Sequence, residues 1–277
     1  MSVLHAIILG IVQGLSEFLP ISSSGHLILV PELFGWQELT SNPSLNKTFD
    51  VALHVGTLVG AVWYFRRDLS RYLVAALRSL RERSLASTDA RIAWLLLLSA
   101  VPGAAVGALL QGTIEDELGD PVLIGVMMMV FGVVLYLADR LPGPRRFESF
   151  RLRDALLMGA AQAVALQPGV SRSGVTISEG RWLGFDRESA TRLSFLMSLP
   201  IIAGAALYQG AQVAGDGGIP SNFVAAFFWG MVASAVSGWF AISWLLRLLR
   251  THTFTPFVIY RLIVGAVVIV VFATGLR

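Results

Sequence analysis

The sequence predicts an all-α polytopic membrane protein, with six transmembrane helices and two re-entrant helix hairpins in an inverted-topology repeat. Three observations support this fold class. Of the 277 residues, 55% are hydrophobic and only 14% are charged, whereas soluble domains carry about 25% charged residues. Apolar segments of about 20 residues, the length at which a helix spans a bilayer, recur along the chain. Two further apolar stretches are each broken at the centre by Pro, Ser and Gly.

Six segments are long and apolar enough to be full spans. They lie at residues 49–66, 89–111, 121–140, 190–211, 222–247 and 256–275. The two broken stretches, at about 4–35 and 152–183, are each expected to form a helix, a turn and a second helix. The chain is therefore expected to be a single membrane domain over 1–277, with a first repeat at 1–140 and a second at 152–277. Each repeat would consist of one hairpin followed by three spans.

Charge placement predicts the orientation of the spans. Arginine-rich connections follow the first and third spans, at residues 66–91 and 140–153. The connections at 112–120 and 212–221 contain acidic residues and no Lys or Arg. Because cytoplasmic loops carry an excess of Lys and Arg, we expect the arginine-rich connections in the cytoplasm. Arg247, Arg250 and Arg261 lie near the loop after the fifth span and are counted with the cytoplasmic arginines.

The same charges predict that both broken stretches are re-entrant. If either stretch crossed the membrane, every later connection would change sides and the charge asymmetry would be lost. The connection at 66–91 contains "LVAALRSLRERSL", which we expect to form an amphipathic helix at the membrane interface. The formal net charge of +3 does not indicate a nucleic-acid partner, because the basic residues lie in loops beside the membrane. Cysteine is absent, which excludes disulfides and thiolate sites.

A weak internal repeat relates the two broken stretches. The segments "GIVQGLSEFLPISSSG" and "GAAQAVALQPGVSRSG" align without gaps at a constant offset of 149 residues. Gln13 aligns with Gln162, and Ser22 with Ser171. Internal similarity with broken helices at corresponding positions is typical of inverted-repeat membrane folds, whose ligand site lies near the midplane. The tips of the two hairpins are therefore expected to meet.

The two breaks together predict a phosphate site. Pro20 and Pro168 each precede serines, which cap helices by accepting hydrogen bonds from exposed backbone N–H groups. Unpaired N–H groups at a helix start bind anions, phosphate above all. Arg172 adds a guanidinium group suited to phosphate oxygens. The substrate-binding candidates are Gln13, Ser22, Ser24, Ser171, Ser173 and Thr176.

Glu17 is the expected counter-charge of Arg172, since an arginine at bilayer depth costs at least ~2.5 kcal/mol and is rarely left without a partner. The pair could be purely structural, or it could be the centre of a catalytic site. The hydroxyl groups on both sides favour the catalytic interpretation. A carboxylate also suits Mg²⁺ or Ca²⁺, which bind carboxylate, water and substrate phosphates together. Glu17 is therefore the metal candidate as well.

Ser23 and His26 are the remaining catalytic candidates. If the serine tip is helical, His26 lies three residues beyond Ser23 on the same face and could transfer its proton. Ser23 would then be the nucleophile, although attack by an activated water or by His26 itself fits equally well.

Other polar residues near these candidates have two interpretations. Capping and catalysis are equally open for Ser22 and Ser24. Ligand contact and a hydrogen bond between helices are equally open for Gln13. His54, four residues after Asp50, could form a proton relay with it, but both lie near the outer end of a span, so an interfacial or packing role is expected.

The stretches "QGLSEFLPISSSGH", "QPGVSRSGVT" and "FTPFVIYRLIVGA" resemble the motifs of the bacterial undecaprenyl-diphosphate phosphatases, the bacitracin-resistance proteins of cell-wall synthesis. The resemblance covers essentially the whole chain. It implies hydrolysis of undecaprenyl diphosphate to undecaprenyl phosphate and inorganic phosphate, which recycles the lipid carrier for peptidoglycan synthesis. It also implies a divalent cation such as Mg²⁺ or Ca²⁺. The implied location is the bacterial cytoplasmic (inner) membrane, with the active site open to the periplasmic side.

By the same resemblance, the family's functional residues fall on Gln13, Glu17, Ser23, His26, Ser171, Arg172, Ser173 and Thr176. Many members have Glu at the position of Gln13, so this chain lacks one possible charged metal ligand.

The alternative function is a transporter or flippase of a phosphorylated lipid or anion, because inverted repeats with paired broken helices are transporter architecture. Ser23 and His26 favour hydrolysis, since transport needs neither a nucleophile nor proton transfer. The expected partners are a polyprenyl diphosphate substrate and membrane lipid, and no nucleic acid. The sequence carries no signal for an oligomeric state.

Overall fold

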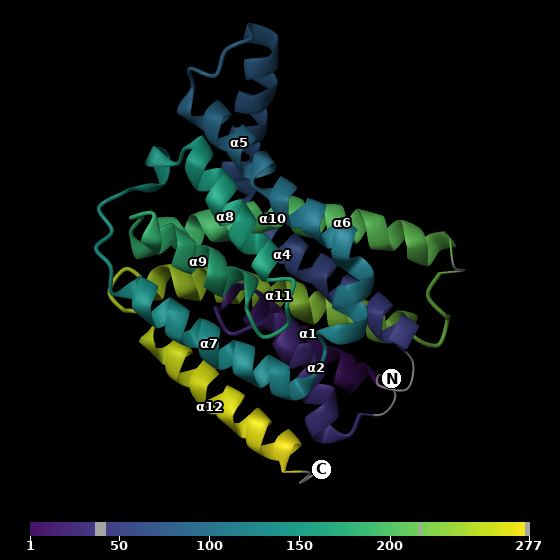
Figure 1. Ribbon diagram of the computed structural model, residues 1–277. Coiled ribbons are helices and arrows are strands. Elements are labelled where there is room, and N and C mark those ends of the chain that lie inside the picture. The colour runs from purple at the N-terminus through teal and green to yellow at the C-terminus, as the bar shows by residue number, and fades with distance from the viewer. Residues whose placement is uncertain (37–42, 216–217, 275–277) are drawn as a thin grey trace.

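The computed structural model describes residues 1–36, 43–215 and 218–274, with the side chains of residues 43–44 and 110–117 outside that description. These residues are almost entirely helical (Figure 1). The helices are α1 (Val3–Phe18), α2 (Ser23–Phe34), α4 (Pro43–Glu82), α5 (Thr88–Leu98), α6 (Ala100–Glu117), α7 (Pro121–Asp139), the 3₁₀ turn η1 (Phe147–Ser149), α8 (Leu152–Val164), α9 (Arg172–Trp182), α10 (Arg187–Gly215), α11 (Val224–Leu248) and α12 (Thr255–Ala273). Within the described ranges, the β-type pairing consists of one bridge between Arg145 and Phe185.

Six helical segments are long and apolar enough to cross a membrane, which confirms the six predicted spans. They are Leu45–Glu82, Thr88–Leu109, Pro121–Asp139, Arg187–Gly215, Val224–Leu248 and Thr255–Ala273. Residue 275, the predicted end of the sixth span, and the acidic side chains predicted at 115–117 and 216 lie outside the description. The re-entrant path of the hairpins and the division into inverted repeats stay predictions.

The segment between the first two spans differs from the prediction. Instead of a separate interfacial helix, α4 continues without interruption to Glu82. The reason is local: no Gly or Pro occurs between Arg66 and Glu82, so no residue interrupts the backbone hydrogen bonds of the helix. The 40-residue helix is about 60 Å long at 1.5 Å per residue, roughly twice the thickness of a bilayer core. In Figure 1 its end and the start of α5 project from the body of the protein.

The second predicted span consists of two helices with a bend between them. α5 ends at Leu98 and α6 begins at Ala100. Pro102 explains the break, because a proline lacks the N–H that would bond to the carbonyl four residues earlier and its ring clashes with that carbonyl. At the bend itself, the carbonyl of Ser99 accepts a hydrogen bond from the side-chain amide of Gln162 at 3.0 Å.

Small residues bring α1 deep into the bundle. Gly10 and Gly14 of α1 lie directly against the backbone of α11, where an added Cβ at either position would collide with Gly230 or Ser234. Such contacts between small residues let membrane helices approach closely. As a result the C-terminal half of α1 is buried, including Glu17. The short helix α9 is also largely buried.

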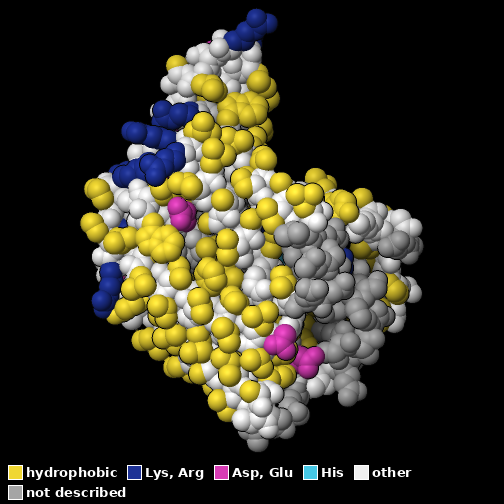
Figure 2. Space-filling model, in the orientation of Figure 1, with side chains coloured by type: hydrophobic (Ala, Val, Ile, Leu, Met, Phe, Trp, Pro, Cys, Tyr) yellow, Lys and Arg dark blue, Asp and Glu magenta, His cyan; other side chains and the backbone are white. Residues whose placement is uncertain are grey.

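The outer surface is apolar over most of the body of the protein. Figure 2 shows hydrophobic side chains covering most of the visible face, while the Lys and Arg side chains gather along its upper-left border, over the α4–α5 projection and the neighbouring loops. Exposed apolar residues on this scale mark a surface that faces lipid. The polar residues of the core are therefore the exception that requires explanation.

Candidate active site

The two helix breaks have the same local structure. α2 begins after Ser22 and α9 begins after Ser171, and these serines have φ angles of 77° and 73°. Each serine hydroxyl accepts a hydrogen bond from the backbone N–H three residues later, at Gly25 and Gly174. A positive φ is uncommon outside glycine, so both serines hold a strained backbone that is compensated by capping. The serine capping expected at both breaks is confirmed.

The two breaks contact one another, as the sequence predicts. The backbone N–H of Gly169 donates to the Ser22 hydroxyl at 3.1 Å, and the Ser173 hydroxyl donates to the carbonyl of Leu19 at 3.1 Å. Gly169 has a φ of 92° and lies against the carbonyl of Ile124, where a Cβ would not fit. Segments about 150 residues apart therefore form one polar centre.

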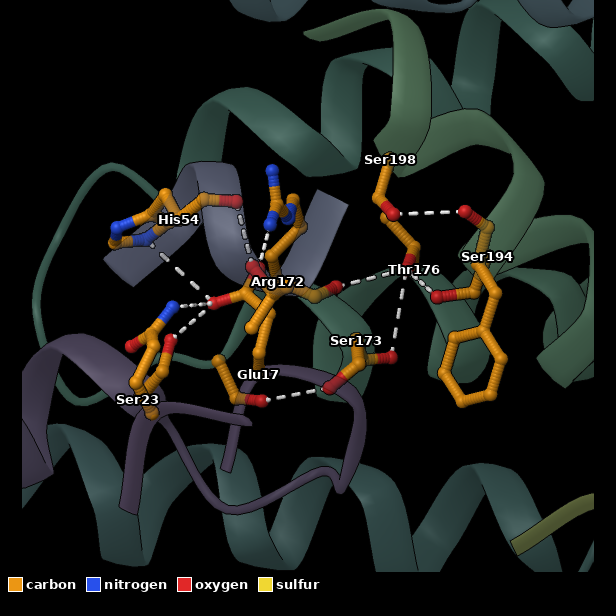
Figure 3. Close-up of polar contacts among 12 residues, drawn as sticks. Glu17, Ser23, His54, Arg172, Ser173, Thr176, Ser194 and Ser198 are labelled. Atoms are coloured by element: carbon orange, nitrogen blue, oxygen red, sulfur yellow. Dashed lines mark hydrogen bonds and ion pairs between the residues drawn. The ribbon is translucent and has the colours of Figure 1, made fainter. Parts of the chain in front are cut away.

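Glu17 lies at the middle of this centre (Figure 3). Its Oε1 forms an ion pair with Nη2 of Arg172. Its Oε2 accepts hydrogen bonds from the Ser23 hydroxyl at 2.7 Å and from the Gln13 amide at 3.0 Å. Glu17 is only 5% exposed, so these partners replace water around the carboxylate. The predicted pairing of Glu17 with Arg172 is confirmed.

Arg172 is the first residue of α9 and therefore stands at a helix N-terminus. About a fifth of its side chain is exposed. Since a guanidinium carries five N–H donors, the contact through Nη2 leaves donors that can face an anion. The location combines the positive charge of a guanidinium with the positive end of a helix dipole.

His54, which the sequence analysis assigned to an interfacial or packing role, belongs to the site. Its Nε2 lies 3.6 Å from Oε2 of Glu17. Its Nδ1 donates to the carbonyl of Asp50 at 2.7 Å, a bond that fixes the tautomer and the ring orientation. The contact arises because α4 packs beside α1, which the position of His54 along the sequence does not reveal.

His26 contacts Ser22 and Tyr260, and not Ser23 as the sequence predicts. Its Nδ1 donates to the carbonyl of Ser22 at 2.6 Å, and since this carbonyl only accepts, Nε2 is the acceptor of the Tyr260 hydroxyl at 2.6 Å. Both ring nitrogens are thus occupied. The hydroxyl of Ser23 bonds to Glu17 rather than to His26.

The other predicted hydroxyl groups mainly shape the backbone. Ser171 and Ser173 lie 3.2 Å apart through their hydroxyls. Thr176 is fully buried and bonds to the carbonyl of Arg172 at 2.7 Å and to the Ser194 hydroxyl at 2.6 Å. Ser24, in the first turn of α2, is half-buried. Ser22, Ser171 and Thr176 therefore hold the breaks and Arg172 in place.

Arg261, which the sequence places near the fifth loop among the cytoplasmic arginines, belongs to the site instead. It lies within α12 and is fully buried. Its guanidinium donates to five backbone carbonyls: Met128 at 2.9 Å, Met127 at 3.5 Å, Pro20 at 3.1 Å, Gly169 at 2.8 Å and Val170 at 3.0 Å. One side chain thus links α7 to both breaks. The available signal was its position six residues inside an apolar helix, since a charge at such depth is retained for a specific purpose.

The residues at the centre fit a divalent cation held partly by substrate. Among the residues that the structure describes, no group of three or more His, Cys, Asp or Glu side chains is placed to hold a metal. However, Oε1 of Gln13 is buried without a hydrogen-bond partner there, next to the Glu17 carboxylate. Mg²⁺ characteristically takes one or two protein oxygens and completes its shell with water and substrate phosphates. Glu17 and Gln13 supply such a pair of oxygens.

Comparison with known proteins identifies the family. Residues 6–267 match the family model described as "Bacitracin resistance protein BacA". The chain is 47% identical to the undecaprenyl-diphosphatase of Pelobacter propionicus, covering 100% of this chain and 99% of the relative. It is 46% identical to that of Geobacter sulfurreducens, over 97% and 98% of the two chains. It is 43% identical to that of a Nocardioides species, over 98% and 97%. The family match and the full-length relatives establish that this chain belongs to the bacitracin resistance protein BacA family.

Proposed function

We propose that the protein is an enzyme that hydrolyses undecaprenyl diphosphate to undecaprenyl phosphate and inorganic phosphate, and so recycles the lipid carrier of peptidoglycan synthesis and confers bacitracin resistance. The observation that carries the proposal is the cluster around Glu17, where a hydroxyl, a carboxylate and a guanidinium meet between two helix N-termini. The name undecaprenyl-diphosphatase, borne by relatives that match over the full chain, supports the same reaction.

Binding of the diphosphate falls to Arg172 and the two helix starts. Phosphoryl transfer requires positioning and neutralisation of negative charge more than covalent assistance. When the guanidinium of Arg172 turns from Glu17 to the phosphate oxygens, it clamps the substrate and leaves the carboxylate free to accept a proton. The polyprenyl chain would remain in lipid, against the apolar surface of the helices.

Ser23 is the proposed nucleophile, because its hydroxyl already donates to Glu17 at 2.7 Å. As the Ser23 oxygen attacks the terminal phosphorus, its proton passes to Glu17, and the bond from that phosphorus to the bridging oxygen breaks. The bridging oxygen leaves as part of undecaprenyl phosphate, and the proton moves from Glu17 to this product. Water then hydrolyses the phosphoserine and releases inorganic phosphate, which restores the Ser23 hydroxyl.

His26 is better suited to proton transfer than to attack, since Nε2 already accepts a hydrogen bond from Tyr260. A divalent cation such as Mg²⁺ or Ca²⁺, held by Glu17 and Gln13, would neutralise charge on the diphosphate. We place the protein in the bacterial cytoplasmic membrane with the site open to the periplasm, an orientation supported by the arginine-rich connections. A lipid carrier or flippase is not favoured, because transport requires no nucleophile such as the Ser23 hydroxyl beside Glu17.

The test is release of inorganic phosphate from undecaprenyl diphosphate by the purified protein in detergent, with and without a chelator. Arg172→Ala should lower kcat/KM by at least about 100-fold, the usual effect of removing a group that stabilises transition-state charge. Arg67→Ala, which removes an exposed arginine of α4, is the matched control. Arg172→Lys keeps a counter-charge for Glu17 and shows whether the loss comes from misfolding. Undiminished phosphate release by both Arg172 variants would exclude the clamp, and binding of the lipid without release by the wild type would favour a carrier.

A further inference from the structure

A second polar cavity lies at the end of the bundle where α7, α9 and α11 finish and α10 and α12 begin. Figure 1 shows these ends together at the left of the view. The cavity has a volume of about 640 Å³, which is within the range of small-molecule sites. It shares no lining residue with the Glu17 site. Five arginines line it: Arg140, Arg146, Arg181, Arg187 and Arg250.

The charges around this cavity do not balance. Three of the arginines face carboxylates: Arg187 contacts Asp139 at 2.5 Å, Arg146 contacts Asp186 at 2.6 Å, and Arg250 lies 3.7 Å from Glu188. Arg140 and Arg181 have no carboxylate partner in the described part of the chain. With five arginines and three acids in the lining, the cavity has a surplus of two positive charges. It therefore attracts an anion.

Arg181 gives the cavity a fixed, pre-formed wall. It is only 3% exposed, and its guanidinium donates to the backbone carbonyls of Phe185 and Leu141. Its Nε is buried without a hydrogen-bond partner among the described residues. The connection that covers it is held by the bridge between Arg145 and Phe185. Held in this way by carbonyls, the guanidinium of Arg181 is a fixed positive charge in the wall of the cavity, which favours a phosphate.

Apolar surface adjoins the cavity on two helices. Leu141 lines it and is 39% exposed, Leu137 of α7 is 54% exposed, and Ile259 of α12, one turn beyond Thr255 of the cavity wall, is 51% exposed. Polar and apolar surfaces thus meet at a boundary, as they do at a membrane interface. A ligand that fits both surfaces has an anionic head and apolar chains.

We propose that this cavity binds the phosphate of an anionic phospholipid, such as phosphatidylglycerol, whose acyl chains lie along α7 and α12. Basic pockets between transmembrane helices commonly recognise anionic headgroups in this manner. The lipid would be a resident ligand, distinct from the diphosphate substrate. It would connect the ends of α7, α9 and α11 with the starts of α10 and α12. The inference depends on the membrane fold and is independent of the reaction proposed above.

The experiment compares lipid retention by native mass spectrometry of the full-length protein in detergent, with phosphatidylglycerol, phosphatidylcholine or inorganic phosphate added. The variant is Arg140→Gln, which removes one unpaired charge at the exposed rim. The matched control is Arg67→Gln, an exposed arginine outside the cavity. We expect Arg140→Gln to weaken phosphatidylglycerol binding about tenfold or more, the loss of one charge-assisted hydrogen bond, while the control binds as the wild type does. Arg181→Lys, which keeps the charge but not the fork, should also weaken binding.

Two outcomes would overturn the proposal. Phosphatidylcholine retained as tightly as phosphatidylglycerol, or an equal loss in Arg67→Gln, would show that the arginines of the cavity do not recognise the headgroup. Inorganic phosphate that competes at equal concentration would identify a free anion, not a lipid, as the ligand. Phosphate release should continue in Arg140→Gln, which separates this test from that of the active site.

Discussion

Arg261 provides the sharpest test of how the two breaks are held. Its guanidinium binds the carbonyl of Pro20 at the first break and those of Gly169 and Val170 at the second, together with Met128 of α7. Replacing it with lysine keeps the charge and much of the length. An ammonium group, however, has three donors, whereas the guanidinium donates to five carbonyls, the fifth being that of Met127. At least one buried acceptor must lose its partner in Arg261→Lys.

The size of the effect follows from this count. A buried acceptor left unsatisfied costs about 1–3 kcal/mol. If the breaks shift to relieve that cost, Ser23, Glu17 and Arg172 lose their alignment. An increase of about 1–3 kcal/mol in the activation free energy lowers kcat by about 5- to 150-fold. A displacement of about 1 Å in a catalytic group has effects of this order. KM should change less, because the phosphate-binding groups themselves remain.

The assay is steady-state phosphate release from undecaprenyl diphosphate, together with a thermal unfolding curve in the same detergent. Arg247→Lys is the control, since Arg247 bonds only to Ser243 within its own helix among the described residues. Wild-type kcat in Arg261→Lys would refute the positioning role. A lower unfolding temperature with unchanged kcat would also refute it, because Arg261 would then contribute only to stability.

Three further predictions concern the groups around Glu17. Ser23→Ala should lower kcat at least about 100-fold, with Ser24→Ala near wild type; release at the wild-type rate by Ser23→Ala would assign the attack to water. Tyr260→Phe keeps the ring stacked on His26 but removes its hydrogen bond, and should lower kcat about tenfold; an unchanged pH–rate profile and kcat would exclude a proton path through this pair. Gln13→Glu adds a charged oxygen beside Glu17 and should lower the free Mg²⁺ concentration that gives half-maximal activity. A titration with an unmoved midpoint would remove Gln13 from the cation site.

The parts of the structure that the sequence predicted are those set by local rules. Six spans followed from apolar length, since a helix must cover about 30 Å of hydrocarbon. The 149-residue offset aligned Ser22 with Ser171, and these serines have the same capping geometry. The contact between the two breaks followed from the same repeat, since the tips of inverted-repeat hairpins meet near the midplane. The pairing of Glu17 with Arg172 followed from the cost of an unpaired charge in lipid.

The parts that were missed depend on how helices pack. His54 contacts Glu17 because α4 packs beside α1 near the first break. The residue pattern within α4 does not indicate which helix packs against it. The contact of Ser23 with Glu17 instead of His26 depends on the sharp turn at Ser22, which directs the two side chains apart. Arg261 was assigned by its nearness to a loop in sequence, whereas its bonding partners come from three other segments.

The breaks explain why a polar site can exist at this depth. A helix interrupted within a membrane exposes backbone groups that lipid cannot satisfy, and such breaks persist only where protein replaces the lost bonds. Here Ser22 and Ser171 cap the new N-termini, and Gly169 donates to Ser22. The guanidinium of Arg261 donates hydrogen bonds to the backbone carbonyls that the breaks leave unpaired. Each of these bonds also fixes the position of Ser23 or Arg172 relative to Glu17. The groups that make the broken helices tolerable are thus the groups that hold the reacting residues in register, and a change in one should affect both stability and turnover.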